Sequence, residues 1–218
     1  MNKVFFMKPF VENFSKKGVF NKAFSIILKI LAVLTIIAAF VIWVLLWKFV
    51  FEIPAAGIAG GVIFQLFFIV GIYMAIHAVF VRAQHISALK TDEYTVVPVV
   101  SIFLKLLGEV YASLTAAIAI GGGILIWFAG GFAADLLKEV PSFIPQYGGG
   151  ATFLGGVIFL AGGLVFAFFT LIAFYFFGEF FKIAAAIAVN TKDISVNTKD
   201  ISSKPAATAK KSTGTSKK

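Results

Sequence analysis

The sequence predicts an all-α integral membrane protein: a four-transmembrane-helix bundle with both termini in the cytoplasm (N-in/C-in) and with cytoplasmic extensions of helices 3 and 4. Two observations predict this class. Apolar residues make up 60% of the 218 residues and charged residues 13%, whereas soluble domains are about 45 to 50% apolar. In addition, four apolar runs are each long enough to cross a hydrocarbon core of about 30 Å, which takes about 20 helical residues.

The distribution of basic residues predicts the orientation. If the four runs cross a bilayer alternately, all nineteen Lys and Arg residues except Lys48 and Lys138 fall on the same side. Membrane proteins concentrate basic residues in their cytoplasmic loops. We therefore expect a multi-pass protein of the bacterial inner (cytoplasmic) membrane. The net charge of +9 then indicates attraction to anionic lipids at the cytoplasmic face and does not favour nucleic acid as a partner.

Residues 1–24 are expected to form a cytoplasmic amphipathic segment that lies on the membrane. Phe6, Phe10 and Phe14 recur every four residues, so a helix would carry them on one face. The lysines beside them would then reach the lipid headgroups. A flexible basic leader is the alternative interpretation of the same segment.

Predicted spans 1 and 2 cover about residues 25–51 and 55–81. Trp43 and Trp47 lie near the outer end of span 1, where amphipathic aromatic rings are enriched. The loop between the two spans is very short, so they are expected to form an antiparallel helical hairpin. Arg82 ends span 2 and begins a polar segment that is expected to be cytoplasmic.

Predicted spans 3 and 4 cover about residues 109–131 and 152–177. The third apolar run starts well before span 3 and is longer than a membrane needs at about 1.5 Å per helical residue. A charged residue such as Lys105 or Glu109 is also costly at the bilayer centre. We therefore assign residues 98–108 to a cytoplasmic helical extension. Helix 4 is expected to continue past its span in the same way, so that the two extensions form an antiparallel pair.

Residues 132–150 form the sizeable external loop of this topology. The loop contains the charged residues Asp135, Lys138 and Glu139 among apolar ones, which is typical of a short amphipathic element. It is a possible docking surface for another protein. A loop that merely rests on the bilayer is an equal alternative.

Beyond the predicted bundle of residues 25–190, residues 191–218 are expected to be a disordered basic cytoplasmic tail. The seven-residue segment VNTKDIS occurs twice, at 189–195 and 196–202. Its apolar residues are spaced five, two and five apart, which does not match the 3.5-residue period of a coiled coil. Asn, Thr and Asp also favour caps and turns over helix interiors. The last residues are rich in Lys, Ser, Thr and Ala and cannot bury a core.

Four charged residues form the most suggestive candidate site, a cluster at the cytoplasmic boundary: Lys105, Glu109, Glu179 and Lys182. In an antiparallel helix pair the two glutamates would lie at similar depth. Neighbouring carboxylates can share a proton or a cation, because each charge raises the pKa of the other, and the pair would then be an ion-coupling site. The alternative, which we favour, is that each glutamate forms an ion pair with a lysine of its own helix or of the other helix.

Small residues recur at spacings of four in three of the spans and predict close helix packing. They are Gly57 and Gly61 in span 2, Ser113, Ala117 and Gly121 in span 3, and, toward span 4, Gly155 with Ala151 and Gly163 with Ala167. The three glycines at 121–123 would alternatively mark a broken helix at a transport site. No charged or amide side chain is expected at the same depth, so packing is the favoured interpretation.

No set of residues in the sequence predicts catalysis, a metal site or a cofactor. The chain has no cysteine and no nucleotide-binding, metalloprotease or hydrolase motif. His77 lies in a span, but no other span offers the second histidine of a bis-histidine haem site.

We therefore expect a non-catalytic accessory or scaffolding subunit of a bacterial inner-membrane protein complex. It would pack through its Gly and Ala helix faces against other membrane protein subunits, against a second copy in a homo-oligomer, or against both. The alternative function is that of a small oligomeric ion or proton channel or transporter that uses Glu109 and Glu179.

Overall fold

The computed structural model describes residues 19–89, 96–133 and 152–203. Four long helices account for nearly all of these residues: α2 (Val19–Glu52), α3 (Ala55–Ser87), α4 (Val96–Ala129) and α6 (Phe153–Ser203). Each helix is long and apolar enough to cross a membrane. The helical class and the four membrane-length helices that the sequence predicts are therefore confirmed for the described part of the chain.

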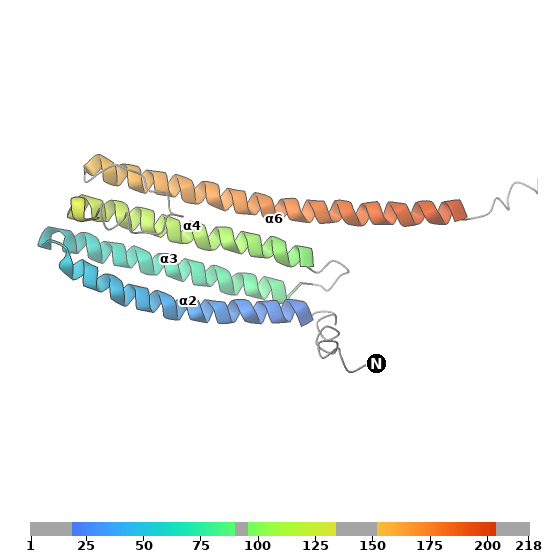
Figure 1. Ribbon diagram of the computed structural model, residues 1–218, viewed down its shortest axis with the longest axis horizontal. Helices are drawn as coiled ribbons and strands as arrows, with labels where there is room; N and C mark the ends of the chain where they lie inside the picture. Colours follow the sequence, from blue (N-terminus) through green and yellow to red (C-terminus); the bar gives the residue numbers. More distant parts are fainter. Residues whose placement is uncertain (1–18, 90–95, 134–151, 204–218) are drawn as a thin grey trace, which may run out of the picture.

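The four helices lie side by side in chain order, and each is antiparallel to the next (Figure 1). Extensive contacts join α2 to α3, α3 to α4 and α4 to α6. Helix α4 is consequently the most buried, with 44% of its most apolar stretch buried against 11% for α2. Helices α2 and α6 lie at the edges. We call the end at which α2 turns into α3 the hairpin end, and the opposite end the far end.

The turn at the hairpin end is short. Only Ile53 and Pro54 separate α2 from α3. The proline ring fixes φ and removes an N–H that has no helical partner at this position, and the Gly57 N–H donates to the Pro54 carbonyl oxygen at 2.6 Å. A Cβ atom on Gly61 would lie 2.9 Å from Val50 Cγ1 of α2. The predicted antiparallel hairpin is therefore present and closely packed.

Glycines set the alignment of the remaining helices. A Cβ atom on Gly71 of α3 would lie 2.5 Å from the Ala117 Cβ of α4, and one on Gly108 of α4 would lie 2.6 Å from the Phe174 Cβ of α6. No side chain larger than hydrogen fits at either contact, so the backbones approach closely and gain dispersion contacts. Helix α4 passes unbroken through residues 121–123, all of which are buried.

Most of the small residues of the predicted packing faces lie at helix contacts, since a Cβ atom on Gly57, Gly61, Gly121 or Gly163 would meet a neighbouring helix. Ser113 is half-buried, and the following are buried: Gly57, Gly61, Ala117, Gly121, Gly155 and Gly163.

Helix α6 is much longer than its neighbour α4. A Cβ atom on Gly178 would lie 3.1 Å from the Ser101 carbonyl oxygen, so Gly178 lies opposite a residue only five positions from the start of α4 at Val96. Helix α6 therefore passes the start of α4 within about two turns and continues beyond the other described helices to Ser203 (Figure 1). We call residues 187–203 the α6 arm. Its residues 190–199 are all exposed.

The α6 arm differs from the disordered tail that we predicted from residue 191 onward. The helix runs through both copies of the repeat. Thr191 and Thr198 do not break it, because their hydroxyls donate to the carbonyl oxygens of Ile187 and Ile194, one turn back, at 2.8 Å. Extending an existing helix also avoids the cost of nucleation.

Three other predicted features lie outside the described residues. They are the amphipathic helix near the N-terminus, the external loop with Asp135, Lys138 and Glu139, and the end of the tail at residues 204–218.

Candidate functional site

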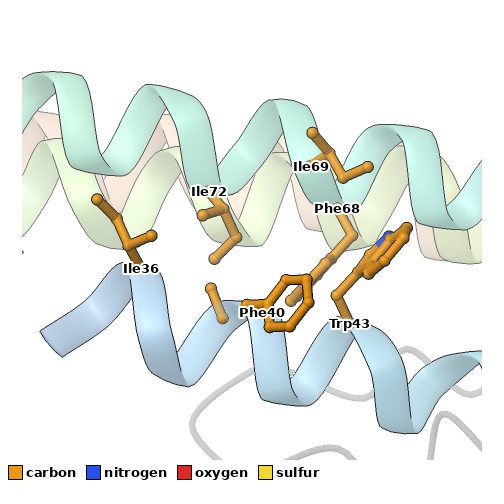
Figure 2. Close-up of a pocket in the computed structure, with 7 residues that line it drawn as sticks. Ile36, Phe40, Trp43, Phe68, Ile69 and Ile72 are labelled. Carbon is orange, nitrogen blue, oxygen red and sulfur yellow. The ribbon is translucent and has the colours of Figure 1, made fainter. Parts of the chain in front are cut away.

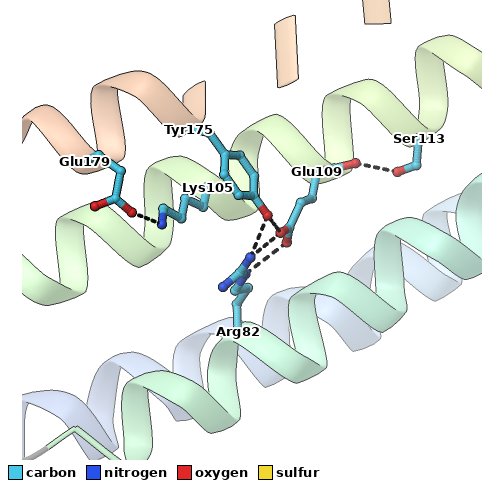
Figure 3. Close-up of polar contacts among 6 residues, drawn as sticks. All are labelled: Arg82, Lys105, Glu109, Ser113, Tyr175 and Glu179. Atoms are coloured by element: carbon cyan, nitrogen blue, oxygen red, sulfur yellow. Dashed lines mark hydrogen bonds and ion pairs between the residues drawn. The ribbon is translucent and has the colours of Figure 1, made fainter. Parts of the chain in front are cut away.

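Polar side chains from three helices meet at the far end (Figure 3). We call them the charged cluster: Arg82 from α3, Lys105 and Glu109 from α4, and Tyr175 and Glu179 from α6. The two members on α4 are four residues apart, as are the two on α6. Residues at this spacing lie on one helix face, so α4 and α6 each present one polar face to the other.

Glu109 lies at the centre of the cluster and joins three helices. Arg82 Nε donates to Glu109 Oε2 at 3.0 Å, and Arg82 Nη2 donates to Glu109 Oε1. The guanidinium therefore binds the carboxylate in a bidentate manner, through two hydrogen bonds. The Tyr175 hydroxyl also donates to Glu109 Oε1. This two-pronged geometry is among the stronger ion-pair arrangements in proteins. The carboxylate therefore ties α3 and α6 to α4.

Tyr175 closes this network. Its hydroxyl oxygen lies 2.8 Å from Arg82 Nη2, so Arg82, Glu109 and Tyr175 contact one another in a triangle. Lys105 lies over the ring of the same tyrosine, with Nζ 5.1 Å from the ring centroid, a distance typical of a cation–π contact. Tyr175 thereby contacts both cations of the cluster.

Glu179 has cationic partners of its own. Lys105 Nζ forms an ion pair with it across the α4–α6 contact, and Lys182 Nζ lies 3.4 Å from the same carboxylate oxygen. Glu179 lies beyond predicted span 4, and its side chain is 52% exposed. The hydrogen bond from Lys105 lowers the pKa of Glu179 below its ordinary value, because it stabilises the charged carboxylate.

Of the four residues predicted to form a charged cluster, the structure places Lys105, Glu109 and Glu179 in it, and Lys182 lies beside Glu179. Glu109 and Glu179 are held by different cations. Glu179 pairs with Lys105 and Lys182, which is the lysine pairing that we favoured. Glu109 pairs with Arg82 instead of a lysine. The arrangement is one of separate, neutralised carboxylates and not of two carboxylates that share a proton.

Sequence reasoning missed two members of the charged cluster, Arg82 and Tyr175. Arg82 is the first charged residue after span 2, and a cation at the end of a span needs a partner or water. That signal points to a nearby carboxylate. Tyr175 carries a weaker signal, its position one turn before Glu179.

His77, which we considered as a haem ligand, lies away from the charged cluster. His77 is exposed, and its ring stacks on that of Tyr73 with centroids 6.1 Å apart. Among the residues that the structure describes, no group of three His, Cys, Asp or Glu side chains is arranged to hold a metal ion.

An apolar groove of about 280 Å³ lies between α2 and α3, on the hairpin side of the charged cluster (Figure 2). Its lining consists of Ile36, Ala39, Phe40, Trp43, Phe68, Ile69 and Ile72. None of these side chains carries a charge, so the groove offers apolar contact and no acid, base or nucleophile.

No family model, no curated protein and no solved structure matches this chain. The function is therefore argued from the geometry of the molecule alone.

Proposed function

We propose that this protein is a non-catalytic accessory or scaffolding subunit of a membrane protein complex in the bacterial inner membrane. Both termini face the cytoplasm, because that orientation places every basic residue except Lys48 and Lys138 on the cytoplasmic side. The far end is then the cytoplasmic end. The start of α4 and the α6 arm are the cytoplasmic extensions.

Two lysines of α2 support this placement in the membrane. Lys29 and Lys48 are nineteen residues apart, or about 29 Å along a helix, which matches a hydrocarbon core of about 30 Å. The Ser25 hydroxyl donates to the Ala83 carbonyl oxygen at 2.7 Å, so Lys29 lies within about one turn of the level of Arg82. The charged cluster consequently lies at the cytoplasmic boundary, where water begins.

The observation that carries the proposal is the α6 arm. It extends past α4 with Ile187, Ile194 and Val196 exposed to 61%, 66% and 49%. The Val, Asn, Thr, Asp and Ser of the repeat are weaker helix formers than Ala or Leu, so packing against a partner would stabilise the arm. A subunit that presents such a helix with uncovered apolar side chains supplies a contact surface.

The charged cluster supports a structural role over ion transport. A channel or transporter that used Glu109 and Glu179 would need carboxylates free to exchange a proton or cation. Glu109 is held by two hydrogen bonds from Arg82 and one from Tyr175, and Glu179 is paired with Lys105. Releasing either one breaks contacts between helices. The alternative function therefore requires the fold to open at each cycle.

The test is extraction of the full chain from native membranes in a mild detergent, followed by separation by mass and identification of the proteins that comigrate. We expect a discrete complex that contains other membrane proteins. A protein that migrates without companions and conducts ions in liposomes contradicts the proposal. In that case the double variant Glu109→Gln, Glu179→Gln should abolish the pH-dependent flux, whereas in a scaffold it only weakens folding or assembly.

A further inference from the structure

Helix α6 carries an apolar stripe on the side that does not contact α4. Its contact with α4 is made by residues such as Phe174 and Gly178. The α6 stripe consists of residues exposed to between 46% and 66%: Val165, Phe169, Ile172, Phe176, Phe180, Ile183 and Ile187, which are spaced three or four apart, and Ile194, which lies seven residues after Ile187 with the polar Asn190 and Thr191 between them. This spacing keeps them on one face over more than seven helical turns.

Lipid can cover only part of this stripe. Along α6, Glu179 is the member of the charged cluster that lies nearest to the α6 arm. Ile187 and Ile194 lie about 12 Å and 22 Å farther along the helix, at 1.5 Å per residue. Headgroup layers add about 5 to 8 Å on each side of the hydrocarbon core. These two isoleucines therefore project beyond the membrane, and no described residue of the chain covers them.

The repeat gives this part of the stripe a period of seven. Ile187, Ile194 and Ile201 are each seven residues apart in the sequence, and Asn190 and Asn197 lie between them. A seven-residue period corresponds to 3.5 residues per turn, the period of a left-handed coiled coil. In the repeat, the apolar residues are spaced five, two and five apart, which does not match a coiled coil, but that count includes Val189 and Val196. On a helix, residues two apart lie on opposite faces, so the valines fall outside the stripe.

We propose that the α6 arm pairs in parallel with the α6 arm of a second copy of this chain, through the stripe that contains Ile187 and Ile194. Two copies with the same orientation in one membrane project their arms in the same direction. Their arms therefore align in parallel, and equivalent isoleucines meet. The anchored spans also prevent a slip by one repeat, which the sequence of the arm alone would allow.

The charges of the arm are compatible with this pairing. In a parallel pair centred on Ile194, Asp193 flanks the seam and faces Thr198 of the other copy, while Lys192 lies on the outer surface. Like charges therefore do not oppose each other across the seam. Asn190 and Asn197 lie in the seam between the isoleucine layers, where polar side chains lower the stability of the pair.

This inference rests on the proposed function in one respect, since it treats the arm as a contact surface. The test uses the full chain in native membranes and the absence of natural cysteine. Ile194→Cys places a thiol in the seam, whereas Val196→Cys places one on the opposite face as a matched control. A disulfide forms only where the two Cα atoms come within about 7 Å.

We expect mild oxidation to cross-link Ile194→Cys into dimers several-fold more than Val196→Cys, and Ile187→Cys to behave like Ile194→Cys. Equal yields at 194 and 196, or no dimer at either 187 or 194, overturn the proposal. The outcome is independent of the test of the proposed function. A complex with other proteins but no cross-link leaves the subunit role standing, whereas a cross-link without other companions leaves only the pairing of two copies.

Discussion

Arg82 of α3 and Glu109 of α4 form a two-pronged ion pair that is mostly buried, with side-chain exposures of 17% and 21%. The pair lies at the far end, whereas the covalent turn of the α2–α3 hairpin lies at the opposite end. The ion pair therefore ties α3 to α4 at the far end, where α3 ends at Ser87 and α4 begins at Val96.

Glu109→Gln should destabilise the protein, because it leaves the guanidinium of Arg82 without a counter-charge. Removing one partner of a mostly buried charged hydrogen bond costs about 1 to 3 kcal/mol. The thermal unfolding midpoint of the purified protein in detergent should fall accordingly. Glu179→Gln is the matched comparison, since Glu179 is half-exposed, and it should lower the midpoint less.

The pairing of Arg82 with Glu109 can be separated from other effects with a double-mutant cycle. Arg82→Gln leaves Glu109 with the Tyr175 hydroxyl as its remaining partner. Combining it with Glu109→Gln removes both charges, so the double variant should cost less than the sum of the two single variants. Additive losses of stability would show that the two residues do not interact.

Tyr175→Phe should weaken the cluster without opening it. The substitution removes the hydroxyl that contacts Glu109 and Arg82 but keeps the ring beside Lys105. We expect a loss of about 1 kcal/mol, the usual contribution of one hydrogen bond, measured by the same unfolding assay. Tyr73→Phe is the control, because Tyr73 is 65% exposed. If both variants unfold at the same temperature, the Tyr175 hydroxyl contributes nothing.

Glu179 should make a small, pH-dependent contribution to stability. Its folded pKa is lowered from an ordinary value of 4.5 by the hydrogen bond from Lys105. A lowered folded pKa means that the stabilisation is complete above the ordinary value and is lost as the pH falls through the folded one. The difference in melting temperature between wild type and Glu179→Gln should therefore shrink as the pH is lowered below about 4.5.

Lys105→Gln tests the cause of this pH dependence. It removes the ammonium group that pairs with Glu179, so the acid-dependent difference between Lys105→Gln and Lys105→Gln, Glu179→Gln should be smaller than in the wild-type background. If the acid-dependent difference in melting temperature is as large in the Lys105→Gln background as in wild type, the partner that lowers the pKa of Glu179 is Lys182, whose Nζ lies 3.4 Å from the same carboxylate oxygen.

The helices could be predicted because hydropathy and length decide them, whereas the C-terminal end of α6 could not. Four apolar runs leave little choice but four helices. The repeat is different, because Asn190, Asp193 and Asn197 are weak helix formers, and local propensity argues for a disordered tail. In the structure the repeat follows directly on a long helix, and continuing that helix requires no new nucleus. The context along the chain overrides the local preference.

The charged cluster could be predicted only in part, for a related reason. Spacing along single helices places Lys105 with Glu109, and Glu179 with Lys182. The partner of Glu109, however, depends on how far α3 is shifted along α4. That shift is set by close contacts such as Gly71 with Ala117, which no single-helix pattern reveals. Arg82 therefore reaches Glu109 through the alignment of two helices.

The Gly71 contact makes that dependence testable. A methyl group on Gly71 would lie 2.5 Å from the Ala117 Cβ and 3.3 Å from the Ser113 carbonyl oxygen, so Gly71→Ala must push α3 and α4 apart. Overpacking of this kind costs about 1 to 3 kcal/mol, and the shift should also weaken the pair between Arg82 and Glu109. Adding Ala117→Gly removes the opposing methyl and should restore most of the unfolding midpoint. If Gly71→Ala alone leaves the midpoint unchanged, the close approach of α3 and α4 at this glycine does not align the two helices.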